Sequence, residues 1–132
     1  MIVPRSVFRI LNDIMAMKEN VIQVKSYSFS VKTVKLGYAL FDKREFILSK
    51  QLIRSATSVG ANVEEAIGAY TKKEFHHKIG IAYKEARESK YWIRLLHDTG
   101  WIDKASAEDF LRDIEELLRL MGAIMSTLRK QN

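Results

Sequence analysis

One short motif in the sequence carries the residue types of a metal site. Glu74-Phe-His-His77 puts a carboxylate and an imidazole three residues apart, on one face of a helix. Di-iron helical bundles use two such motifs together with two further glutamates, all pointing inward. The remaining histidine, His97, has Arg94 and not a glutamate three residues before it, so the chain has no second motif. We therefore predict no metal and no cofactor, and expect His76 and His77 to lie exposed.

Paired carboxylates are the second candidate for chemistry, since two of them can divide acid and base roles. They occur as Glu64 with Glu65 and as Glu85 with Glu88. Polar residues beside helix seams more often fix the register of the helices. We predict that a structural polar network contains Arg54, Asn62, Glu65 and Glu88. The chain also has no Gly-x-Ser-x-Gly elbow, and we predict no catalytic residues and no enzyme activity.

The composition narrows the class of protein. The chain has 132 residues, one proline and no cysteine, which suits a single domain. The absence of cysteine excludes a disulfide scaffold, a thiolate zinc site and an iron–sulfur cluster. Charged residues interrupt every apolar stretch well before about 18 residues, so we expect no membrane span and a cytoplasmic protein.

Basic residues are the third candidate, for binding rather than catalysis. The formal net charge is +6, and residues 17–54 hold eight Lys or Arg against three Asp or Glu. Lys18, Lys25 and Lys32 follow one another at intervals of seven, so a helix would present them on one face. A basic stripe can track phosphates, although a simple solvated helix face is the alternative. The candidate nucleic-acid-binding residues are Lys18, Lys25, Lys32, Lys35, Lys43, Arg44, Lys50, Lys72, Lys73 and Lys78.

Heptad-like apolar spacing indicates the elements that must position these residues. Four segments repeat apolar residues at intervals of three and four, which is typical of helices that bury one face. The expected helices cover Glu19–Leu40, Ile47–Ala69, Lys72–Asp98 and Ser106–Lys130. The expected core positions of the first are Val24, Tyr27, Val31, Val34, Tyr38 and Phe41. Those of the other three are Leu52, Ala56, Val59, Val63 and Ala66; Phe75, Ile79, Ala82, Ala86, Ser89, Ile93 and Leu96; and Phe110, Ile114, Leu117, Met121, Ile124 and Leu128.

The fold class that follows is all-α, an antiparallel up-down four-helix bundle. We divide the chain into an N-terminal extension, residues 1–16, and a bundle domain, residues 17–132. Within the extension, residues 4–15 share an apolar face and are expected to form a short extra helix.

Local signals place the helix ends. Thr71 and Glu74 form a capping-box pattern, Gly68 and Gly100 end the second and third helices, and Ser106 is the expected N-cap of the fourth. The run 55–61, SATSVGA, favours close packing against a bulky neighbour such as Tyr91 or Trp92, with an adaptable helix or an oligomer contact as alternatives. We expect Tyr91, Trp92 and Trp101 to pack in the core or at a subunit interface rather than to stack on bases.

Two runs carry a resemblance to a known family. LSKQLIRSATSVGANVEEA over 48–66 and IAYKEARESKYWIRLL over 81–96 resemble the bacterial four helix bundle protein family, also called the 23S rRNA intervening-sequence or S23 family. The resemblance covers about residues 19–130 and includes Gln51, Arg54, Ser55, Ser58 and Asn62. Many members have Asn-Ile-Ala-Glu-Gly where this chain has Asn-Val-Glu-Glu-Ala at 62–66, so a role tied to that glycine does not carry over.

The resemblance implies an up-down bundle that assembles into a ring-shaped homopentamer. Some members are encoded inside intervening sequences of 23S rRNA genes, and a structurally similar retroelement accessory protein works with a reverse transcriptase and nucleic acid. We therefore expect a non-enzymatic homo-oligomer with a basic surface for RNA, DNA or a nucleoprotein such as a reverse transcriptase, and no membrane partner. The alternative is a protein-interaction scaffold or accessory subunit with no direct nucleic-acid role.

Overall fold

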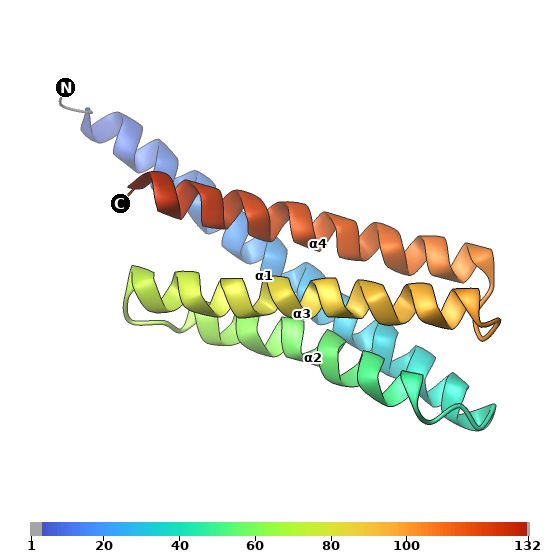
Figure 1. The fold of residues 1–132 in the computed structure, drawn as a ribbon. Helices are drawn as coiled ribbons and strands as arrows, with labels where there is room; N and C mark the ends of the chain where they lie inside the picture. Colours follow the sequence, from blue (N-terminus) through green and yellow to red (C-terminus); the bar gives the residue numbers. More distant parts are fainter. Residues whose placement is uncertain (1–3, 132) are drawn as a thin grey trace.

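Four long helices and short connections make up the structure, a computed structural model that describes residues 4–131 (Figure 1). The helices are α1 (Arg5–Asp42), α2 (Leu48–Ile67), α3 (Lys72–Asp98) and α4 (Lys104–Gln131). Each packs against two neighbours, in the order α1, α2, α3, α4 and back to α1, with the α2–α3 contact the most extensive. This confirms the predicted all-α four-helix bundle.

The first helix is longer than we predicted. Residues 4–15 do not form a separate helix, because α1 runs unbroken over 38 residues from Arg5. Pro4, the only proline, stands at the N-cap, where its missing N–H costs no helical hydrogen bond. At 1.5 Å per residue α1 is about 57 Å long and α2 about 30 Å. The first turns of α1 consequently project beyond the other helices (Figure 1). Residues 1–3 of the proposed extension lie outside the described residues.

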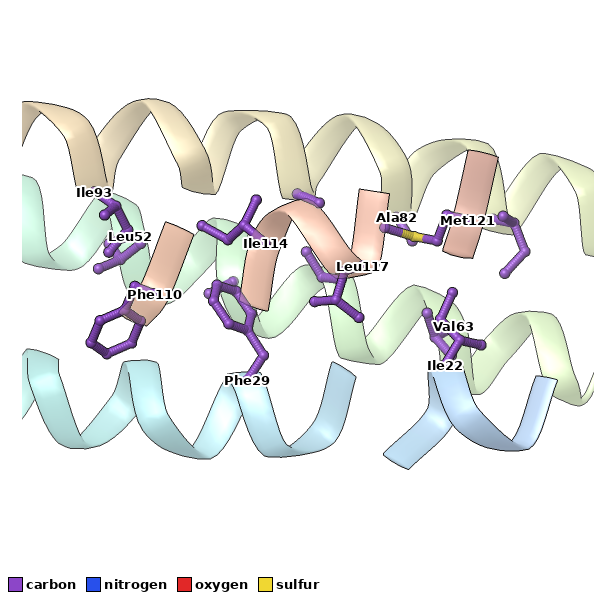
Figure 2. Packing of buried hydrophobic residues seen from close by; sticks show 14 of the residues in the cluster. Ile22, Phe29, Leu52, Val63, Ala82, Ile93, Phe110, Ile114, Leu117 and Met121 are labelled. Atoms are coloured by element: carbon purple, nitrogen blue, oxygen red, sulfur yellow. The ribbon is translucent and has the colours of Figure 1, made fainter. Parts of the chain in front are cut away.

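The core runs along the bundle axis and is built from apolar residues of all four helices (Figure 2). Every predicted core position of α2, α3 and α4 is buried, which confirms those three seams. Phe29 of α1 and Phe110 of α4 meet edge to face, with ring centroids 6.4 Å apart.

The predicted core face of α1 was wrong. The buried positions are Ile22, Ser26, Phe29, Thr33, Gly37 and Leu40. Val24, Tyr27 and Tyr38 are instead 63–68% exposed. The helix has apolar residues on both sides, and its inner side is the one whose small residues let α2 approach closely.

Small residues bring the helices together at two places. A Cβ on Gly60 of α2 would lie 2.9 Å from the hydroxyl oxygen of Ser30 on α1, which is closer than packed atoms come. On the other side of α2, the hydroxyl of Ser89 on α3 donates to that of Ser55 at 2.9 Å. The run 55–61 therefore packs closely, as predicted, and its neighbours at these two places are small residues of α1 and α3.

The helix ends follow the sequence signals with one correction. Thr71 accepts the N–H of Glu74 at 3.0 Å, which confirms Thr71 as the N-cap of α3. The Glu74 carboxylate reaches back as predicted, but it accepts the N–H of Tyr70, the residue before the cap, at 3.2 Å. Gly68 is the C-cap of α2, and Gly100 ends α3 with φ +86°. Ser106 is not the N-cap of α4. Asp103 accepts the Ser106 N–H at 2.7 Å, because a carboxylate just before the first turn serves equally well.

Candidate nucleic-acid interface

Three of the ten predicted nucleic-acid-binding cations form ion pairs with carboxylates of a neighbouring helix. Lys25 lies 2.7 Å from Glu116, and Lys78 lies 3.3 Å from Glu65. Lys32 lies 2.6 Å from both Asp109 and Asp113. The stripe predicted from Lys18, Lys25 and Lys32 is therefore not a row of free charges.

Lys32 has the most restricted surroundings of the three. Its Nζ atom also lies over the Phe110 ring, 4.8 Å from the centroid. Partial burial acts to lower the pKa of the Lys32 ammonium, but hydrogen bonds to Asp109 and Asp113 outweigh it and raise the pKa. The same hydrogen bond lowers the pKa of Asp109. Lys32 thus joins α1 to α4 and is poorly placed to bind phosphate.

The remaining predicted cations fall into separate groups. Lys35, Lys43, Arg44 and Lys50 lie exposed around the α1–α2 connection. Lys72 and Lys73 lie exposed at the start of α3, and Lys18 is half-buried near the projecting end of α1. Among the described residues none of these seven has a carboxylate within 4 Å, so they remain available to an anionic partner.

The four residues predicted as one polar network are in three places. Arg54 bonds to Glu88, and the Trp92 indole N–H donates to the same carboxylate at 3.1 Å. The Arg54 hydrogen bond lowers the pKa of Glu88 and raises that of Arg54. Asn62 instead donates to the Ser58 carbonyl of its own helix at 2.9 Å, and Glu65 pairs with Lys78. The network reduces to the α2–α3 pair formed by Arg54 and Glu88.

The two adjacent histidines differ. His77 is exposed, as predicted, whereas His76 is half-buried and its Nε2 atom has no hydrogen-bond partner among the described residues. His76 borders a hollow of about 450 Å³ at the junction of α3 and α4, together with Lys72, Lys73, Leu128 and Arg129. No three His, Asp or Glu side chains within residues 4–131 gather into a possible metal site.

Sequence reasoning missed a group of cations on α3. Lys84, Arg87 and Arg94 lie exposed on its outer side, with the exposed Tyr91 between the two arginines. Tyr91 was expected in the core or at a subunit interface. Its side chain faces outward, which excludes the core, while the half-buried Trp92 and Trp101 pack against the core. Their spacing in the sequence could have revealed this group, because residues 84, 87, 91 and 94 lie on one face of a helix.

The outer side of α1 is apolar over most of its length. Its exposed apolar residues repeat at intervals of three and four, as in a coiled-coil seam. They are Val7, Ile10, Ile14, Met17, Val21, Val24, Val31 and Tyr38, interrupted at the intervening positions by Ser28 and Lys35. We call these eight residues the α1 outer seam. Exposed apolar surface of this extent marks an interaction site.

The described helices include none that is both long enough and apolar enough to cross a membrane.

Fold and surface together define a four-helix bundle with one apolar and several basic faces. The chain belongs to the 23S rRNA-intervening sequence protein family, whose model matches residues 18–123. A solved structure from Bacteroides thetaiotaomicron, a protein of unknown function from the S23 ribosomal protein family, is similar to it with a TM-score of 0.80 and 39% identity. The similarity covers 83% of this chain and 98% of that one. No functionally curated protein matches the chain.

Proposed function

We propose that this protein is a non-enzymatic, self-associating bundle of the cytoplasm, a homopentamer that offers a basic surface to nucleic acid or to a nucleoprotein such as a reverse transcriptase. The observation that carries the proposal is the α1 outer seam. It extends along a helix of 38 residues and leaves large side chains such as Val24 and Tyr38 in water.

A second copy of the chain is the occupant that fits this seam. Residues spaced as in a heptad pack best against another helix with the same spacing, and each copy carries one. Removing a fully exposed valine from water contributes about 1.5–3 kcal/mol. The valines of the seam are 37–68% exposed and contribute less each, so association needs most of the seam to be covered. The number five comes from the family resemblance. A ring of five uses two different contact surfaces on each copy, here the two edges of the seam, each against the seam of a neighbouring copy.

The net charge supports nucleic acid as the partner. Each chain carries +6, and five chains in one ring would carry +30. Such a charge density raises the local concentration of a polyanion and accelerates its association. The family's name refers to an RNA, which agrees with this choice of partner.

A scaffold without a nucleic-acid role is the second candidate. The ion pairs of Lys25, Lys32 and Lys78 favour it, because they remove three cations from the surface that the sequence assigned to phosphate. Such a protein would use its exposed faces to hold other proteins together.

Two measurements on the intact protein test the proposal. Light scattering should give a native mass of about 77 kDa, five times the 15.3 kDa of one chain; a monomer would refute self-association. Fluorescence anisotropy with labelled RNA and DNA should show binding that weakens steeply as salt rises. An oligomer that binds neither at low salt would favour the scaffold.

A further inference from the structure

The outer face of α3 carries a row of cations along most of the helix. Lys73, His77, Lys84, Arg87, Tyr91 and Arg94 are all exposed and follow one another at helical spacing. We call these six residues the α3 stripe. From residue 73 to residue 94 it extends about 32 Å, at 1.5 Å per residue. Four of its six members are Lys or Arg: Lys73, Lys84, Arg87 and Arg94.

The charges of the α3 stripe are not neutralised by neighbouring acids. Among the described residues, Lys73, Lys84, Arg87 and Arg94 have no carboxylate within 4 Å. Glu85 and Glu88 bond to Arg54, and Glu115 lies 2.5 Å from Lys90, with Arg87 near enough to act on the Glu115 charge as well. The stripe therefore presents positive charge to solvent.

Tyr91 places an aromatic ring within this row. Its side chain is 53% exposed, and Arg87 and Arg94 lie one turn away on either side. The Trp92 ring supports it edge to face, with centroids 4.9 Å apart. Tyr91 and the two arginines border a hollow of about 220 Å³ together with Lys90 and Leu118. A ring flanked by guanidinium groups can stack on a base while the arginines hold its phosphates.

The opposite end of the α3 stripe is also a basic hollow. Lys73 belongs both to the stripe and to the 450 Å³ hollow near His76 and Arg129. His76 lines this hollow beside Lys72, Lys73 and Arg129, although its own Nε2 atom is buried. The positive end of the α3 dipole adds to the attraction. Two basic hollows thus lie at either end of one continuous row.

The position of α3 in the bundle leaves the stripe free when copies associate through α1. The two helices occupy opposite corners and make no contact with each other, with α3 in front and α1 behind in Figure 1. Copies that contact one another only through their α1 outer seams therefore leave these cations uncovered.

We infer that the α3 stripe binds a single-stranded nucleic acid without sequence preference, its cations tracking the phosphates and Tyr91 stacking on an unpaired base. The inference rests on the proposed nucleic-acid-binding function and locates it on α3 rather than on the α1 and α2 lysines. An unpaired strand is favoured because base pairs within a duplex keep their faces stacked on one another and out of reach of Tyr91.

Two triple variants with equal loss of charge test the location. The first is Lys84→Ala, Arg87→Ala and Arg94→Ala. The control is Lys35→Ala, Lys43→Ala and Lys50→Ala, which removes three free cations from α1 and α2. Anisotropy with a 20-nucleotide single strand, as RNA and as DNA, should show about 100-fold weaker binding for the first variant at 0.1 M salt and a log–log salt slope shallower by about 2. The control should stay within about threefold of the wild type.

Tyr91 is tested by a pair of substitutions. Tyr91→Ala should weaken binding about fivefold to 100-fold, whereas Tyr91→Phe, which keeps the ring, should bind as the wild type does. Tighter binding to a duplex of the same length would overturn the inference. So would equal losses in the two triple variants, or a lower native mass for the α3 variant, which would make the stripe a subunit contact. If the wild type bound no strand at low salt, the proposed function itself would fail.

Discussion

The Nζ atom of Lys32 on α1 lies 2.6 Å from a carboxylate oxygen of Asp113 on α4 and at the same distance from Asp109. Replacing this lysine should therefore reduce stability rather than nucleic-acid binding. Lys32→Met, which keeps most of the apolar stem, should lower the free energy of unfolding by about 1 kcal/mol, because two neighbouring carboxylates lose their shared cation. Urea denaturation measures this change.

Lys35→Met is the matched control, since Lys35 is exposed and has no carboxylate within 4 Å among the described residues. Its free energy of unfolding should stay within about 0.5 kcal/mol of the wild type. If Lys32→Met were as stable as the control but bound nucleic acid more weakly, the assignment of Lys32 to the bundle would be wrong.

The ion pairs of Lys32 could not be predicted from the sequence, although most of the buried helix faces could. The heptad spacing of α2, α3 and α4 predicted their buried faces, because on each helix only one side is apolar. It could not show that Lys32 meets Asp109, 77 residues further along, since that contact depends on which helices become neighbours and at what register. The charge stripe on α1 was therefore a sound pattern, but two of its three members, Lys25 and Lys32, form ion pairs with α4.

The prediction of the inner face of α1 failed for a different reason. Its core residues include Ser26, Thr33 and Gly37, which score as polar or neutral, whereas the exposed side carries valines and tyrosines. Ser26 can be buried because its hydroxyl donates to the Gln23 carbonyl at 3.2 Å, within the same helix. Hydrophobicity alone therefore selects the seam that faces away from the bundle, and only packing identifies the inner one.

Glu45 should make α2 sensitive to acid. The residue is only 6% exposed, and its carboxylate accepts the N–H groups of Ile47, Leu48 and Ser49 at 2.7–3.0 Å. Burial acts to raise the pKa of Glu45, but these N–H donors outweigh it and hold the pKa below its ordinary 4.5. The stabilisation is therefore complete above pH 4.5 and is lost as pH falls through the lower folded value.

Glu45→Gln should accordingly cost about 1 kcal/mol at pH 7, and its deficit relative to the wild type should shrink toward pH 3. Urea denaturation at both pH values measures the two differences. Glu108→Gln, at an exposed position of α4, should show little deficit at either pH. A deficit for Glu45→Gln that is unchanged at pH 3 would exclude the charged carboxylate as the cap.

Substitution of two glycines by alanine should change the stability of the protein in opposite directions. An added Cβ meets nothing within 4 Å at Gly100 or at Gly122, so crowding plays no part at either. Gly100 has φ +86°, which strains an L-residue, and Gly100→Ala should destabilise the protein by about 1 kcal/mol. Gly122 lies within α4, where Gly122→Ala should stabilise it by about 0.5–1 kcal/mol. Melting temperatures that shifted in the same direction would contradict this.

Charge placed on the α1 outer seam should separate the subunits while each bundle stays folded. Val24 is 68% exposed and Val31 37% exposed in the single chain, so Val24→Glu with Val31→Glu removes little from the core. In an oligomer that uses this seam, the same glutamates would be buried without partners, at a cost of several kcal/mol each. Light scattering should then show a mass near 15.3 kDa with unchanged helical circular dichroism. Ala105→Glu with Ala123→Glu adds the same charge to exposed positions of α4 and should leave the native mass of the wild type. An oligomer that survived both double substitutions would have to be held by a face other than α1.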